Sequence, residues 1–280
     1  MTGRSLHDAL LRVLTSARLR GLALAGDVAA LGAEVGHAEA AALCATDPAR
    51  LGGLARFMGR HFFRERIVRL FAAGRRVARE SGRDPLRVLE GPAFGAFLDS
   101  AELGSTGSAE TVARLVEDEL APVLGAVGWG PALLAYEGAL FRAEAGPRRW
   151  GTARTGTMAV RAAGARVLTL AWDVTPLVAA VRRGEATLPA PGAGPARLLI
   201  ALGADGRVSA ARCSDGLARL LDALAEPQPP AALAAALGVP EADLRGALEG
   251  LAGIGAVEWR AAAAAPAGDS GPAAAARELR

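Results

Sequence analysis

Side chains that could act as nucleophiles, general bases or metal ligands are scarce in this 280-residue chain. It has two cysteines, Cys44 and Cys213, and three histidines, His7, His37 and His61. No histidine has a carboxylate or a cysteine at the spacing of a metal site or a catalytic triad, and the cysteines are expected to be small core residues. The sequence contains no phosphate-binding loop and no Gly-x-Ser-x-Gly motif. We therefore expect no catalytic residues, no metal site and no cofactor, in a chain that is not an enzyme by itself.

Arginine dominates the charged residues. All 32 basic residues are arginine, against 29 acidic residues, and the formal net charge is +3. Between Arg50 and Arg87 there are eleven arginines and only three acidic residues. Arg56, Arg60 and Arg64 are four residues apart and fall on one helical face, which is either a solvated surface or a docking surface for an acidic partner. Nucleic acid is not expected to bind there, because the aromatic residues among the arginines are expected in the core.

The composition is typical of a globular bacterial protein encoded by GC-rich genes. Hydrophobic residues make up 51% of the chain and aromatic residues only 4%, and there is no lysine or asparagine. Charged residues interrupt every apolar run before it reaches the length of a membrane-spanning helix. The N-terminus lacks the apolar stretch of a signal peptide, and two distant cysteines do not indicate a disulfide framework. We therefore expect a cytoplasmic protein that does not associate with a membrane.

The first half of the chain has the apolar spacing of helices, and we predict an all-helical domain over residues 1–145. The clearest pattern lies at 48–81, where apolar residues recur at helical spacing over one long helix or a pair of helices. A Gly-Trp-Gly-Pro run at 128–131 separates the last two predicted helices, and Ser108 is expected to cap the first of these two. The other helices are predicted at about 5–14, 22–44, 92–101, 108–127 and 131–144.

The sequence pattern changes after residue 145. Residues 146–165 lack periodicity and are expected to form a linker, and residues 261–280 are low-complexity and expected to be disordered. Between them, residues 166–260 are predicted to form an α+β domain. The Asp205-Gly206 turn between two short apolar segments is a strong hairpin signal. The predicted order is a strand near 167–172, a helix at 175–183, the hairpin, helices at 215–224, 230–237 and 240–252, and a strand at 256–259 that returns along the sheet.

Helix, turn, helix and a short strand form the winged helix-turn-helix pattern, which first suggests DNA binding. The third helix of this pattern carries three acidic residues against one arginine, and this net negative charge would repel phosphate. These residues are Glu241, Asp243, Glu249 and Arg245. A DNA-binding transcription regulator with a helical sensor or dimerisation domain stays as the alternative function, and a helical enzyme domain with a regulatory winged helix as a third.

The order of elements in the second domain also resembles the peptide-recognition elements of pathways that modify ribosomally made peptides. In those elements a leader peptide adds a strand to a sheet edge and packs against the third helix. The resemblance assigns the edge to the segment 207–212 and an apolar groove to this strand and the third helix. The expected peptide-binding residues are Arg207, Val208, Ala210, Arg212, Leu244, Ala247 and Leu248, with Leu251 beside them. Leu248 and Leu251 also fit a plain core.

The whole layout is similar to one protein family. The helical region contains the arginine-rich segment RFMGRHFFRERIVRLF and a later Ala-Tyr-Glu-x-x-Leu pattern with Tyr136, Glu137 and Leu140. An Asp-Val-Thr-Pro-Leu stretch starts at Asp173, and the hairpin RLLIALGADGRVSAARC and the winged-helix pattern follow. This order resembles the partner proteins of multinuclear non-haem iron-dependent oxidative enzymes in ribosomal-peptide modification, over most of residues 5–260.

The resemblance implies a non-catalytic accessory subunit. Such a partner protein binds the leader of a precursor peptide and presents a core residue, typically a cysteine, to the metal site of an iron-dependent oxidative maturase. The iron is then expected in the partner enzyme and not in this chain. The arginine-bearing helical face at Arg56, Arg60 and Arg64 is the expected docking surface for the enzyme.

Overall fold

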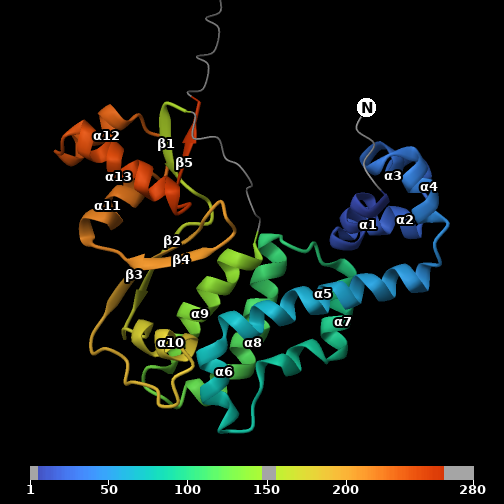
Figure 1. Ribbon diagram of the computed structural model, residues 1–280, viewed down its shortest axis with the longest axis horizontal. Helices are drawn as coiled ribbons and strands as arrows, with labels where there is room; N and C mark the ends of the chain where they lie inside the picture. Colours follow the sequence, from blue (N-terminus) through green and yellow to red (C-terminus); the bar gives the residue numbers. More distant parts are fainter. Residues whose placement is uncertain (1–5, 147–155, 262–280) are drawn as a thin grey trace, which may run out of the picture.

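A computed structural model describes residues 6–146 and 156–261. In Figure 1 a small helical bundle contains the N-terminal residues, a larger helical body follows it, and the C-terminal part combines strands with short helices. The fold is of the α+β class, as the sequence predicts, with helices in the majority and two small antiparallel sheets. The predicted disordered tail lies outside the described residues except for residue 261.

The N-terminal bundle consists of four short helices that pack on the start of a long one. The predicted helix at 22–44 is divided, because Gly26 and Gly36 adopt positive φ values of 70° and 109° and end the helices there. Ser16 and Asp27 cap the helices that follow them through their side-chain oxygens. The elements are α1 (Leu6–Thr15), α2 (Ala17–Leu24), α3 (Val28–Val35), α4 (His37–Cys44) and α5 (Pro48–Leu70).

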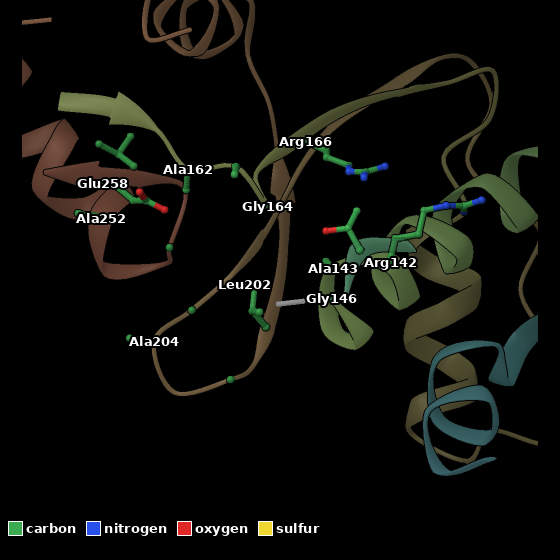
Figure 2. Close-up of a pocket in the computed structure, with 16 residues that line it drawn as sticks. Arg142, Ala143, Gly146, Ala162, Gly164, Arg166, Leu202, Ala204, Ala252 and Glu258 are labelled. Atoms are coloured by element: carbon green, nitrogen blue, oxygen red, sulfur yellow. The ribbon is translucent and has the colours of Figure 1, made fainter. Parts of the chain in front are cut away.

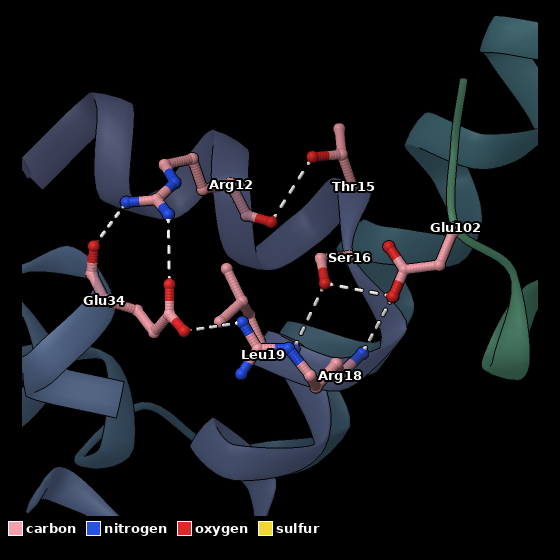
Figure 3. Close-up of polar contacts among 7 residues, drawn as sticks. All are labelled: Arg12, Thr15, Ser16, Arg18, Leu19, Glu34 and Glu102. Atoms are coloured by element: carbon pink, nitrogen blue, oxygen red, sulfur yellow. Dashed lines mark hydrogen bonds and ion pairs between the residues drawn. The ribbon is translucent and has the colours of Figure 1, made fainter. Parts of the chain in front are cut away.

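The bundle is fastened to the helical body by polar contacts at one loop, drawn in Figure 3. The carboxylate of Glu102 accepts hydrogen bonds from the Ser16 hydroxyl and from the backbone N–H of Arg18, both at 3.1 Å. The backbone N–H of Leu103 donates to the carbonyl oxygen of Thr15 at 2.9 Å. These bonds join the start of α2 to a loop more than 80 residues later in the chain.

The helical body is built around α9, which is buried over most of its length. The predicted helix pair at 48–81 is confirmed, since the chain bends at Phe71 between α5 and α6. The cap of α8 is Ser105 and not Ser108, which lies buried inside that helix. Phe63, Phe94 and Phe141 are fully buried in the shared core. The elements after α5 are α6 (Ala72–Arg79), the 3-10 helix η1 (Pro85–Leu89), α7 (Pro92–Ser100), α8 (Thr106–Leu124) and α9 (Gly130–Ala145).

A three-stranded antiparallel sheet with the order β2-β3-β4 lies between two cores. Its strands are β2 (Arg166–Leu170), β3 (Ala196–Leu202) and β4 (Val208–Arg212), and α10 (Thr175–Arg182) follows β2. Along β3, Leu198 and Ile200 pack into the core of the helical body. Leu199 and Ala201 point to the opposite face and pack into a second core with the last three helices. The sheet therefore contributes to both cores.

The C-terminal helices α11 (Asp215–Ala223), α12 (Pro230–Leu237) and α13 (Glu241–Gly253) are confirmed close to their predicted positions. The final strand is different from the prediction, because β5 (Val257–Arg260) does not join the hairpin sheet. It pairs antiparallel with β1 (Met158–Arg161), which lies in the segment expected to be a linker. Ala159 is buried and also bridges to Gln228. A strand of four residues is too short to show the alternation by which strands are predicted.

Candidate functional site

The outer edge of β4 has free backbone groups. In an antiparallel pair, residues alternate between those bonded to the neighbouring strand and those whose N–H and C=O point away. The Cys213 N–H donates to the Arg197 carbonyl oxygen at 2.8 Å, and the Gly203 N–H donates to the Arg207 carbonyl oxygen at 2.9 Å. This alternation directs the backbone groups of positions 209 and 211 toward β3. The backbone groups of positions 208, 210 and 212 therefore point outward.

Four of the expected peptide-binding residues lie on this edge. Ala210, Arg207 and Arg212 are exposed, whereas Val208 is half-buried against the core of the helical body. The guanidinium of Arg212 pairs with the carboxylate of Asp173. Burial alone would raise the pKa of Asp173, but the hydrogen bonds from Thr175 and the charge of Arg212 lower it. The edge is thus held at one end by an ion pair and is open along its length.

The residues expected from α13 lie elsewhere. Leu244 and Leu248 are buried in the second core, with Leu251 beside them, and Ala247 is exposed on the outer face of the helix. Val208 shares a sheet face with Leu198 and Ile200, because residues two apart on a strand point the same way and paired residues share a face. That face meets the helical body and not α13. The structure therefore does not assemble β4 and α13 into a single apolar groove.

A groove that the sequence analysis did not identify runs along β2. It has a volume of about 750 Å³ and lies between β2, α8 and α9. By the same alternation, the backbone groups of Val167 and Thr169 point away from β3 toward the outer edge. Apolar side chains line the groove, with charged side chains at its rim. The lining includes Ala121, Leu134, Ala135, Ala139, Val167 and Leu168, together with Glu117, Asp118, Arg142, Arg161 and Arg166.

A smaller cleft of about 260 Å³ adjoins this groove and shares Arg142 and Arg166 with it. Figure 2 shows these two arginines on the side of α9 and β2, with Ala252 and Glu258 on the opposite wall. The turn of the β3–β4 hairpin forms a further wall at Leu202. The groove and the cleft together offer an extended ligand a path beside one free sheet edge.

The two arginines that the groove and the cleft share differ in their electrostatic surroundings. Arg142 is held between two carboxylates, with its Nε 2.7 Å from Glu110 and its Nη1 2.6 Å from Glu117. The hydrogen bond from Arg142 lowers the pKa of Glu110, and the same contacts raise the pKa of Arg142. Arg166 is exposed and makes no ion pair with another residue that the structure describes. Of these two arginines, Arg166 is therefore the one available to a ligand.

The predicted docking arginines on α5 are partly used inside the fold. Arg56 donates two hydrogen bonds to Asp99, at 2.7 and 2.9 Å, and this contact lowers the pKa of Asp99. Arg60 donates to the carbonyl oxygen of Leu89 at 3.3 Å. Arg64 is exposed and forms no ion pair within the described part of the chain. Of the three, only Arg64 is unengaged.

Metal binding and membrane insertion gain no support from the described residues. Over residues 6–146 and 156–261 no group of three His, Cys, Asp or Glu side chains is placed to hold a metal ion. In the same ranges no helix is long and apolar enough to cross a membrane. The three acidic residues of α13 are exposed, and Glu241 pairs with the exposed Arg245 at 2.9 Å.

Comparisons with known proteins do not assign this chain to a family. No known protein family matches the chain, and no curated protein matches it either. A functional assignment therefore depends on the two open sheet edges, the groove beside one of them and the exposed face of the helical region.

Proposed function

We propose that this protein is a non-catalytic accessory subunit that binds the leader of a ribosomally made precursor peptide and presents it to an iron-dependent oxidative maturase. The observation that carries the proposal is the open edge of β4, where the alternate positions 208, 210 and 212 direct backbone donors and acceptors outward. A peptide in extended conformation can add a fourth strand there. The order of α11, α12, α13 and β5 behind the sheet supports a winged-helix-like recognition element.

The side chains of the β4 edge suit such a peptide. Ala210 and Ala211 are small and exposed on opposite faces of the sheet, so their side chains do not hinder a strand that adds at the edge. Arg207 at the start of the strand adds positive charge and is only weakly paired, 3.8 Å from Asp205. Backbone hydrogen bonds would supply affinity that is largely independent of sequence, and Arg207 would supply selectivity for acidic residues. The iron and the oxidation belong to the partner enzyme in this proposal.

The first experiment is an affinity purification of the tagged chain from its native cells, with nuclease treatment. Co-eluting proteins and peptides are identified by mass spectrometry, and the eluate is assayed for iron. We expect an iron-containing enzyme together with a short peptide. Recovery of neither, with specific DNA enriched when nuclease is omitted, would replace the proposal with the transcription-regulator alternative.

The second experiment locates the peptide on the sheet. Proline at position 210 removes one outward N–H without breaking a bond to β3, so Ala210→Pro is expected to weaken binding of the recovered peptide at least about tenfold with the fold intact. Ala211→Pro is the matched control, because the N–H it removes points to β3 and its loss destabilises the sheet.

Thr169→Pro makes the corresponding change on β2. If Thr169→Pro weakens binding and Ala210→Pro does not, the peptide lies in the β2 groove, and if neither does, strand addition is wrong.

A further inference from the structure

One face of α5 exposes apolar side chains at regular spacing. Leu54, Phe57 and Val68 are 41%, 67% and 39% exposed, although large apolar residues are mostly buried elsewhere in the described chain. With His61 and Arg64 they occupy positions 54, 57, 61, 64 and 68, which alternate between steps of three and four residues. This spacing is that of the contact seam of two packed helices. We call these five residues the α5 seam.

The α5 seam is on the side of the helix opposite to its core contacts. Leu51 and Ala55 pack into the core of the N-terminal bundle, and Phe63 and Ile67 pack into the core of the helical body. In Figure 1, α5 extends from one of these bodies to the other. The helix is therefore fixed at both ends by buried side chains, and its outer face is presented as a rigid surface.

The ring of His61 extends the apolar surface of the seam. It is stacked on Phe57, with 6.4 Å between ring centroids and 5° between ring planes. His61 Nε2 lies 3.1 Å from the carboxylate of Glu65. A groove of about 770 Å³ borders the C-terminal half of the seam and is lined by His61, Arg64 and Val68 among others. Val68 is the apolar seam residue in this lining, and the other lining residues are polar or charged, so the groove lies at the charged end of the seam.

The charge around the seam is positive. Arg50, Arg60 and Arg64 are exposed and make no ion pair with any residue in the described ranges. Glu65 is the one acidic residue of α5, and it already faces His61. The other exposed arginines of the helix, Arg56 and Arg69, are neutralised by Asp99 and Glu144. A partner that covers the seam must therefore supply carboxylates opposite the three remaining arginines.

A second copy of this chain does not meet that requirement. In a parallel pair of seams, Arg64 would face Arg64 of the other copy. In an antiparallel pair centred on His61, Arg60 would lie close to its own equivalent, and Glu65 would lie opposite position 57 and not opposite an arginine. Like charges opposite each other disfavour both arrangements.

We infer that the α5 seam is a docking surface for an amphipathic helix of another protein, with apolar side chains opposite Leu54, Phe57 and Val68 and acidic side chains at its flanks. The apolar contact supplies most of the affinity, and the charges set the orientation and exclude basic helices. This inference does not depend on peptide binding at the sheet, which lies on a different part of the molecule.

Binding of a synthetic helix tests the inference. The probe is a fluorescent 21-residue peptide with leucine at the core positions of three heptads and glutamate at the flanking positions, and its counterpart has lysine in place of glutamate. We expect the acidic peptide to bind the full chain at least about tenfold more tightly than the basic one in fluorescence anisotropy, with affinity that falls as salt rises. Phe57→Asp and Arg64→Glu are each expected to weaken binding of the acidic peptide at least about tenfold.

Matched substitutions on other surfaces serve as controls. Val239 is 42% exposed, similar to the apolar seam residues, and Arg219 is exposed on α11. Val239→Asp and Arg219→Glu are expected to leave the affinity unchanged. Because Phe57 is largely exposed, Phe57→Asp should also keep the thermal unfolding midpoint of the wild-type protein.

Three results would overturn the inference. The first is that the chain binds the acidic and the basic peptide equally well, or that it binds neither of them. The second is wild-type affinity of Phe57→Asp for the acidic peptide. The third is a dimer in sedimentation analysis that Phe57→Asp dissociates, which would make a second copy the occupant. None of these results bears on peptide binding at β4, so the two proposals fail separately.

Discussion

At the scale of single residues, the most unusual group is the carboxyl group of Glu137 in α9. Its side chain is 1% exposed and accepts hydrogen bonds from the backbone N–H groups of Ala73 and Gly74, at 2.8 and 2.9 Å. These are the first N–H groups of α6, which have no partner within the helix. Glu137 thus has a structural function, as the cap that joins two helices of the body. The same residue was part of the sequence pattern that carried the family resemblance.

Burial raises the pKa of Glu137 from 4.5 to about 8. Between these values the folded state holds the proton and the unfolded chain releases it, so this group's contribution to stability is complete below about pH 4.5 and is lost as pH rises through 8. The free energy of unfolding of the wild-type protein should therefore fall between pH 5 and pH 8.5. We expect this fall to be smaller in Glu137→Gln, by on the order of a few kcal/mol, when both proteins are measured in urea titrations.

Glu110→Gln is the contrasting control for this prediction. The pKa of Glu110 is lowered by Arg142, so its contribution is present at neutral pH and is lost in acid. Its replacement should lower stability at pH 7 and leave the slope above pH 5 unchanged. A Glu137→Gln protein with the wild-type slope between pH 5 and 8.5 would contradict the assignment.

At the scale of elements, the connection between α8 and α9 is a close approach of two backbones. A Cβ atom at Gly130 would lie 1.8 Å from the carbonyl oxygen of Leu124, so only glycine fits without a shift of the chain. We expect Gly130→Ala to destabilise the protein by about 1–3 kcal/mol in chemical denaturation. Gly107 in α8 has open space around its Cβ position, and Gly107→Ala should be neutral or slightly stabilising. Equal stability of the two variants would show that the turn is able to relax.

At the scale of the whole molecule, a buried arginine joins the N-terminal bundle to the helical body. Arg20 is 4% exposed and donates to the carbonyl oxygens of Leu14, Leu98 and Asp99 at 3.1, 3.0 and 2.8 Å. The first of these carbonyls is in the bundle, and the other two are at the end of α7. Beside the continuous helix α5, the Arg20 side chain and the Glu102 contacts therefore hold the two bodies together.

Replacement of Arg20 by methionine keeps the length of the side chain but leaves these buried carbonyl groups without their donor. We expect Arg20→Met to cost about 2–4 kcal/mol and to increase hydrogen exchange in α1–α4 and at the end of α7, with β2–β4 unaffected. Arg18→Met removes an exposed ion pair with Glu34 and should cost less than about 1 kcal/mol. Uniform exchange changes over the whole molecule would mean that the bundle and the body unfold as one unit.

The sequence by itself determined most helices and the hairpin, because their signals are local. The Asp47-Pro48 start of α5, the proline near the start of α9 and the Asp205-Gly206 turn act within a few residues. The α+β class follows from the same local signals. The open edge of β4 was predictable to the extent that a hairpin strand was recognised at 207–212.

The tertiary structure decided which surfaces remain available. Three arginines of the segment 50–87, Arg56, Arg83 and Arg69, are neutralised by Asp99, Glu119 and Glu144, which lie 36 to 75 residues away in sequence. The pairing of β1 with β5 and the groove beside β2 also join distant segments. Charge count and periodicity describe each segment alone, whereas an ion pair, a strand partner or a groove exists only when the packing of the cores has brought two segments together.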